Sequence, residues 1–242
     1  MNAAITAGGR VDGKLRDLMG TPVKALARVD GRTLLERAIS AARQAGAEKI
    51  AVVGGAEVRA ACANSVEMIV DERPSGAQNV HGALFAWPQE PLLYLSSDLP
   101  YLSGEAVREF LERAQPDAIA MPLADAQAYA KRFPSAPAHA VTIGGERVAN
   151  GSVFFIPQGA AYAIDAAAQR FFRARKSLVK MAMLLGPELL WKFLVRRLRI
   201  ADIERKAARE LGFGVFAIRD SAPELCFDID TEADFAYALA HR

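Results

Sequence analysis

Residues Leu92–Ser103 read LLYLSSDLPYLS, a short apolar run that ends in two serines, an aspartate and a proline. An apolar run followed at once by polar and turn-forming residues predicts a buried strand that leaves its sheet near Ser96. Ligands of open α/β sheets bind just beyond the carboxyl ends of the strands, which is where Asp98 stands. Asp98 is therefore either a cap for the turn before Pro100 or a ligand of a cation. This stretch alone leaves both alternatives open.

Similar apolar runs recur through the first half of the chain, separated by segments with helical periodicity. Strands are expected at Ala3–Thr6, Ile50–Val53, Glu67–Val70, Leu92–Leu95 and Ala118–Met121. Helices are expected at Thr33–Ala45, Glu57–Ala63, Ala77–Ala86 and Gly104–Ala114. Regular alternation of strands and helices predicts an α/β protein with a doubly wound, mostly parallel sheet.

The pattern changes after about residue 125. We expect a loop at Tyr129–Pro137, strands at Ala138–Ile143 and Ser152–Ile156, a helix-rich segment at Ala160–Leu211, strands at Gly214–Ile218 and Leu225–Ile229, and a helix at Glu232–Ala240. The chain is then one domain over residues 1–242, with a helical insertion at 160–211.

Composition narrows the class of protein. The 242 residues are 52% hydrophobic, which predicts a globular chain, and the net charge of +2 argues against a nucleic-acid binder. Cys62 and Cys226 lie far apart without the spacing of a zinc site or a disulfide framework, so a reducing, cytoplasmic setting is expected. The first ten residues lack the basic region of a signal peptide.

The helical insertion is strongly basic. From Arg170 to Arg209 there are 12 basic and 3 acidic side chains, a net charge of +9, whereas the rest of the chain carries −7. The basic side chains form either a solvated face or a surface for an anionic partner, which would be a lipid, an acidic acceptor or a second subunit. The aromatic residues Phe171, Phe172, Trp191 and Phe193 are expected in the core.

Part of this insertion resembles a membrane-interface helix. The window Leu178–Leu198 carries too many charges to span a bilayer. Its apolar residues, Trp191 and flanking cations are nevertheless typical of a helix that lies on a membrane surface. Peripheral contact with the inner face of the membrane through residues 170–209 is therefore a hypothesis.

The first stretch whose residues suggest a binding or catalytic site is AITAGGRVDGKLRDLMGTPVKAL, Ala4–Leu26. Glycines let backbone amides approach a phosphate closely, and the basic side chains of the following polar loop, Arg10, Lys14, Arg16 and Lys24, would neutralise it. The spacing is neither that of a P-loop nor that of a dinucleotide-binding loop. The alternative is an ordinary glycine-rich turn with exposed charges.

The second such stretch is CFDIDTEADF, Cys226–Phe235. Asp228 and Asp230 are two residues apart on an expected strand, so both side chains would reach one cation. Thr231 and Asp234 fit the capping pattern of the helix that follows.

Taken in order, AGGR with a downstream KAL, then SDLP, then DIDTEADF resemble the motifs of the molybdenum-cofactor guanylyltransferase-like (MobA-like) NTP transferases. The resemblance implies a Rossmann-like nucleotidyltransferase fold. This chain differs from the family pattern in that Val23 separates Pro22 from Lys24. The second basic residue of the loop is either Lys14 or Arg16.

The resemblance also implies roles for particular residues. Lys24, Arg10 and Asp98 would be catalytic, and Mg²⁺ would be held by Asp98 with one or both of Asp228 and Asp230. The nucleotide would contact Ala7, Gly8, Gly9, Arg10 and Lys24. Its base or ribose would lie near Ser75, Gly76 and Asn79, and the acceptor would lie near Asn150, Gly151 and Ser152.

The implied reaction moves a nucleoside monophosphate from an NTP to a phosphorylated acceptor, either a small molecule or a lipid-linked phosphate, with release of pyrophosphate. Two alternatives remain. A glycosyltransferase of related fold usually has two acids in a DxD at the fourth strand, where this chain has only Asp98. A nucleotide-binding or membrane-docking protein without turnover would not need Lys24, Asp98 and the two late aspartates together.

Overall fold

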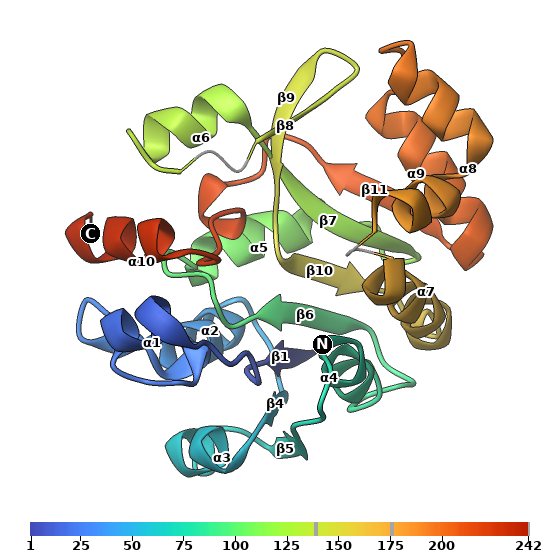
Figure 1. Cartoon of the computed structure of the whole chain (residues 1–242). Helices are drawn as coiled ribbons and strands as arrows, with labels where there is room; N and C mark the ends of the chain where they lie inside the picture. Colours follow the sequence, from blue (N-terminus) through green and yellow to red (C-terminus); the bar gives the residue numbers. More distant parts are fainter. Residues whose placement is uncertain (138–139, 175–176, 242) are drawn as a thin grey trace.

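The computed structural model describes residues 1–137, 140–174 and 177–241 and centres on a nine-stranded sheet (Figure 1). In chain order its strands are β1 (Asn2–Thr6), β4 (Ile50–Gly54), β5 (Met68–Asp71), β6 (Leu92–Ser96), β7 (Ala118–Asp125), β8 (Val141–Ile143), β9 (Glu146–Asn150), β10 (Val153–Ile156) and β11 (Gly214–Ile218). The spatial order is β5-β4-β1-β6-β10-β7-β9-β8, with β11 paired to β7. All strands of this sheet except β9 and β10 run in one direction, which confirms the predicted mostly parallel α/β fold.

Helices cover both faces of the sheet (Figure 1). They include α2 (Leu34–Gln44), α3 (Ala56–Cys62), α4 (Gly76–Leu84), α5 (Gly104–Glu112) and α7 (Ala161–Ala174). Side chains such as Ile5 and Leu95 pack in a core with α2, α3 and α5, whereas Ala4 and Leu92 belong to the core with α4 and α7. Because successive side chains point to opposite faces, strands covered on both sides are apolar throughout.

Two segments predicted as loops contain helices. The expected polar loop after β1 forms α1 (Gly13–Met19), which carries Lys14 and Arg16 on its exposed surface. The expected loop at Tyr129–Pro137 is partly the helix α6 (Ala126–Arg132). Asp125 begins α6 by accepting hydrogen bonds from the backbone amides of Gln127 and Ala128, a local cap that periodicity does not reveal.

The predicted strand at Leu225–Ile229 is wrong. Its place is taken by a short 3₁₀ turn, η2 (Pro223–Leu225), and a segment without regular structure. Instead of a strand ladder, the Ile229 amide donates to the Asp98 carbonyl at 3.1 Å. The following helix, α10 (Glu232–Ala240), begins at Thr231 with the predicted capping box to Asp234.

A helical segment lies between β10 and β11, where the insertion is predicted. It consists of α7, α8 (Leu178–Leu194) and α9 (Ile200–Leu211), and α8 is kinked at Gly186, where φ is 76°, just before Pro187. In the described part of the chain no helix combines the length and apolar character needed to cross a bilayer. Arg175 and Lys176 of the basic segment lie outside the described residues, as do the first two residues of the strand expected at Ala138–Ile143, which continues as β8.

Smaller elements complete the fold. Before α2 the chain forms the 3₁₀ turn η1 (Lys24–Leu26) and a hairpin of β2 (Arg28–Val29) and β3 (Arg32–Thr33). The strand β9, which the sequence pattern misses, pairs with β8 through a turn that contains Gly144 and Gly145. Both glycines have positive φ, at 59° and 89°, a backbone conformation that favours glycine.

Candidate active site

A cavity of about 1230 Å³ lies at the edge of the sheet where the parallel strands β1, β4, β5 and β6 end. This is the edge at which open α/β sheets bind ligands. The predicted site residues that line it are Gly8, Gly9, Arg10, Lys24, Ser75, Gly76, Asn79, Asp98, Ser152, Asp228 and Asp230. Segments from both ends of the chain therefore meet around one cavity.

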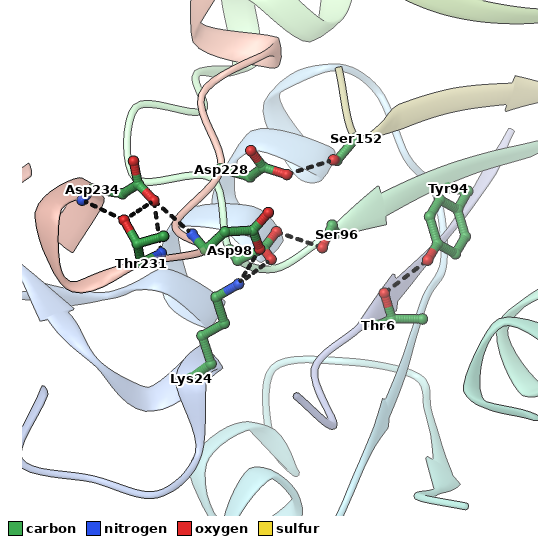
Figure 2. Close-up of polar contacts among 10 residues, drawn as sticks. Thr6, Lys24, Tyr94, Ser96, Asp98, Ser152, Asp228, Thr231 and Asp234 are labelled. Carbon is green, nitrogen blue, oxygen red and sulfur yellow. Dashed lines mark hydrogen bonds and ion pairs between the residues drawn. The ribbon is translucent and has the colours of Figure 1, made fainter. Parts of the chain in front are cut away.

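Lys24 lies among the carboxylates of this cavity (Figure 2). Its Nζ donates to Asp98 Oδ2 at 2.7 Å and lies 3.4 Å from Asp230 Oδ1. Burial lowers the pKa of this ammonium, but the charge and hydrogen bond of Asp98, with the charges of Asp230 and Asp228, raise the pKa above its usual value overall. The side chain is 14% exposed and stays cationic at neutral pH. The Lys24 amide donates to the Gly9 carbonyl at 2.9 Å, which ties this cation to the glycine loop.

Asp98 does not cap the following helix. Its Oδ1 accepts a hydrogen bond from Ser96 Oγ at 2.5 Å while Oδ2 receives Lys24, and α5 is capped by Ser103. The carboxylate therefore faces the cavity and is held from two sides (Figure 2).

Asp228 and Asp230 reach the cavity although they do not lie on a strand. Ser152 Oγ, just before β10, donates to Asp228 Oδ2 at 3.4 Å. The bond between the Ile229 amide and the Asp98 carbonyl fixes the residue between the two aspartates beside the end of β6. The predicted strand geometry of this pair is thus wrong, although both side chains share one cavity with Asp98.

The donor set suits a hard divalent cation. Carboxylates from Asp98, Asp228 and Asp230 line one cavity, and such oxygens are the ligands that Mg²⁺ prefers. Within the described residues, no three His, Cys, Asp or Glu side chains are grouped closely enough to hold a metal ion by themselves. Magnesium sites commonly use one or two carboxylates together with substrate phosphates, so the residues present fit such an ion.

Arg10 is held by acids on neighbouring elements. Its guanidinium lies 3.1 Å from Glu57 Oε2 on α3 and 3.6 Å from Glu72 Oε2 after β5. The hydrogen bond and charge of Glu57, with the charge of Glu72, raise the pKa of Arg10. Lys14 and Arg16, the other basic residues of the predicted loop, do not line the cavity.

Ser75, Gly76 and Asn79 form the first turn of α4. Ser75 begins the helix by accepting a hydrogen bond from the Gln78 amide, and Asn79 Oδ1 accepts one from the Arg73 amide at 2.7 Å. A Cβ atom at Gly8 would lie 3.0 Å from Asn79 Nδ2, so the glycine allows α4 to approach the loop after β1.

Three predicted site residues lie outside the cavity. Ala7 is fully buried, and its amide donates to the Val53 carbonyl at 2.8 Å. Asn150 is an exposed residue at the end of β9. Gly151 packs against the Leu225 carbonyl, which a Cβ atom would approach to 2.4 Å. From this segment it is Ser152 that reaches the cavity.

Sequence reasoning missed several residues of the cavity. Tyr94 donates to or accepts from Thr6 Oγ1 at 2.9 Å, and burial raises the pKa of Tyr94 to about 12. Its place was predictable, since Tyr94 and Ser96 are two residues apart on β6 and share a face. Phe171 and Phe172, predicted as core, line the cavity instead. Glu72 shows no pattern that would have singled it out.

The other two aromatic residues predicted in the core are exposed. Trp191 is 66% exposed and Phe193 is 57% exposed. Both follow the kink of α8 and face away from the sheet core, which corrects the prediction made from helical spacing.

The fold and this cavity are those of an α/β protein that binds its ligand at the carboxyl ends of parallel strands. Comparison with known proteins agrees, because residues 3–198 match the MobA-like NTP transferase domain. The chain belongs to this family and is an enzyme of the nucleotidyltransferase class. The matched segment ends before Asp228 and Asp230, which the fold nevertheless brings to the same cavity.

Solved structures show the same fold. A hypothetical transferase from Thermus thermophilus is 27% identical with a TM-score of 0.84, over 96% of this chain and 98% of that one. The 2-C-methyl-D-erythritol 4-phosphate cytidylyltransferase from the same organism is 19% identical with a TM-score of 0.57, over 99% and 97%. Rv0371c of Mycobacterium tuberculosis, in complex with manganese, is 16% identical with a TM-score of 0.52, over 100% and 98%. None of the curated proteins matches the chain.

Proposed function

We propose that this enzyme transfers a nucleoside monophosphate from an NTP to a phosphorylated acceptor, with Mg²⁺, and releases pyrophosphate. A phosphate oxygen of the acceptor forms a bond to the α-phosphorus while the bond from that phosphorus to the bridging oxygen breaks, and the electron pair leaves with pyrophosphate. The observation that carries the proposal is the Lys24 ammonium bonded to Asp98 and close to Asp230 in the cavity beside the glycine loop.

The residues of the cavity supply charge and alignment. Both reactants are anions, so catalysis needs mainly neutralisation and positioning. The amides of Gly8 and Gly9 and the cations of Lys24 and Arg10 would contact the phosphates. Asp98 with one or both of Asp228 and Asp230 would hold Mg²⁺, which neutralises charge on phosphate oxygens when bound.

The remaining assigned residues would shape the two ends of the site. Ser75, Gly76 and Asn79 would border the base or ribose. Ala7, Asn150 and Gly151 would act through their neighbours, since Ala7 precedes Gly8 and the other two precede Ser152. We treat residues 1–242 as one catalytic domain in the cytoplasm, with 160–211 as an insertion.

Pyrophosphate release tests the proposal. The enzyme with Mg²⁺ is offered ATP, GTP, CTP and UTP in turn, each with a panel of sugar, polyol and lipid-linked phosphates. Release that needs both substrates supports transfer, whereas activity only with an NDP-sugar supports the related glycosyltransferases. Tight NTP binding without release under every acceptor supports a protein without turnover.

Asp98→Asn tests the metal and catalytic assignment. The change keeps the shape of the side chain but removes its charge, so we expect turnover to fall by about 100- to 1000-fold. Circular dichroism should be unchanged, and Mn²⁺ binding followed by electron paramagnetic resonance should weaken. Asp117→Asn, an exposed acid outside the cavity, is the control. Unchanged Mn²⁺ affinity and turnover in Asp98→Asn contradict the assignment.

We also propose peripheral contact between residues 170–209 and an anionic membrane, which suits a lipid-linked acceptor. Pro187, Trp191 and Leu194 lie on one helical face of α8 at spacings of four and seven residues, and the last two are each 66% exposed. The exposed Arg196 and Arg197 follow. Apolar side chains next to cations are typical of helices that bind anionic bilayers.

Flotation with vesicles tests this contact. We expect the protein to float with phosphatidylserine-containing vesicles at low salt, and the double variant Trp191→Ser, Leu194→Ser to remain in solution. Val141→Ser, which changes an apolar residue that is 48% exposed elsewhere, is the control and should float. A native protein that stays wholly in solution contradicts the contact.

A further inference from the structure

The cavity has an aromatic wall, formed by Phe171 and Phe172 of α7. Phe171 is 46% exposed and Phe172 is half-buried, and the two rings meet edge to face with centroids 6.1 Å apart. Both residues belong to the helical insertion, whereas the charged residues of the cavity come from the sheet edge. This wall has no part in the charge neutralisation described above.

Contacts between α7 and α4 fix the position of the wall. The Tyr162 ring meets the Phe85 ring edge to face at 4.8 Å, and Asp165 Oδ2 lies 3.2 Å from His81 Nδ1. The later residue of α7, Asp165, contacts the earlier residue of α4, His81, so the two helices run antiparallel. The two helices lie side by side (Figure 1), and the C-terminal end of α7 therefore lies over the first turn of α4, where Phe172 meets Gly76.

Gly76 makes room for the wall. A Cβ atom at Gly76 would lie 2.7 Å from Phe172 Cε1, closer than carbon atoms approach without displacement. The φ angle of Gly76 is not positive, so the need for glycine here is one of space. The Phe172 ring thus lies directly on the backbone of α4 at its N-terminal end.

The same turn of α4 also contacts the glycine loop after β1. Asn79, three residues after Gly76, has its Nδ2 within 3.0 Å of the Cβ position of Gly8. The glycine loop and the aromatic wall therefore contact the same turn of α4, and a nucleotide with its phosphates at Gly8 and Lys24 would extend to the wall if it follows this turn. The uncharged residues Phe172, Gly76 and Val80 line this cavity, together with the charged Glu72 and Arg73 of the segment before α4.

We propose that Phe172 stacks on the nucleobase of the bound NTP. The inference rests on the proposed nucleotidyl transfer and adds a residue of the insertion to the nucleotide site. A flat, uncharged ring is the ligand group that suits an aromatic face beside a helix turn whose Gly76 has no side chain. Because every base has a π face, stacking raises affinity for NTPs in general and does not by itself select the base.

Binding measurements separate the base from the phosphates. Calorimetry gives the Kd of ATP, GTP, CTP and UTP with Mg²⁺, and of inorganic tripolyphosphate, which has no base. We expect Phe172→Ala to weaken the best NTP by roughly tenfold and to leave tripolyphosphate unchanged. Phe172→Leu, which keeps apolar volume without a flat ring, should show the same loss. Phe193→Ala, an exposed aromatic outside the cavity, is the matched control.

Fluorescence gives a direct readout. In Phe172→Trp, a base stacked on the indole should quench emission when the NTP is added, and tripolyphosphate should not. Equal Kd values for the NTP in native protein and Phe172→Ala overturn the proposal, as does an equal loss of NTP and tripolyphosphate binding. If Phe172→Ala binds the NTP more weakly but the native enzyme releases no pyrophosphate, the stacking proposal is supported and the proposed nucleotidyl transfer is contradicted. Absence of NTP binding by the native protein overturns both.

Discussion

Lys24 is the cation that contacts both Asp98 and Asp230 in the cavity. Its pKa lies above the usual value near 10.5, so the folded state binds this proton more tightly than the unfolded chain does. The stabilisation is therefore complete below pH 10.5 and is lost as the pH rises through the higher pKa of the folded protein. At neutral pH the ammonium is therefore fully protonated, as the proposed contact with a substrate phosphate requires.

Lys24→Met tests this arrangement. We expect kcat/KM to fall by about 100- to 1000-fold, because the cation is removed from among the carboxylates and from the phosphates. Urea denaturation of both proteins should show a stability difference that is constant from about pH 7 to 10 and shrinks only above about pH 10.5. A difference that disappears near pH 8 would mean that Lys24 loses its proton early and that Asp98 does not hold it charged.

Among the elements, the corner between β9 and β10 connects the part of the cavity that Ser152 lines to η2. The Gly151 amide donates to the Pro122 carbonyl at 3.0 Å, and the Ser152 amide donates to the Leu225 carbonyl at 3.2 Å. The corner thus places Ser152, and through it Asp228, at the cavity. Its glycine is required because the Leu225 carbonyl lies against it.

Gly151→Ala is expected to destabilise the fold. The new Cβ would approach the Leu225 carbonyl to 2.4 Å, so the corner must shift, at a cost of about 1–3 kcal/mol in the free energy of unfolding. Urea denaturation measures this cost. Gly9→Ala is the control for stability, since its Cβ would meet only the Lys24 side chain at 3.8 Å. Equal stability of the two variants would show that a Cβ atom fits at position 151 without a shift of the corner.

Elements with strong local signals were predictable. The strand Leu92–Leu95 is apolar because both faces are covered, and Thr231 with Asp234 forms the expected capping box. The helix α6 was missed because a cap at Asp125 begins it, and the expected strand at Leu225–Ile229 is replaced by contacts to distant backbone. Local periodicity carries no information on a helix cap or on backbone partners that are distant in the sequence.

At the scale of the whole molecule, residue type indicated which side chains share the cavity better than it indicated how they are arranged there. The sequence places Lys24, Asp98, Asp228 and the glycine loop as candidates, and the fold gathers them around one cavity. It does not reveal that Arg10 meets Glu57 and Glu72, nor that α7 brings Phe172 to the far wall. Those contacts depend on how helices pack across the sheet.

The position of β10 between β6 and β7 has a consequence for how the chain folds. β10 comes later in the sequence than both neighbours, so the sheet cannot grow by adding strands in chain order. Pairing of β6 directly with β7 is a competing topology, and a molecule caught in it would be kinetically trapped without Ser152 at its cavity. Assembly of the cavity therefore depends on the insertion of β10 between two strands that precede it in the sequence.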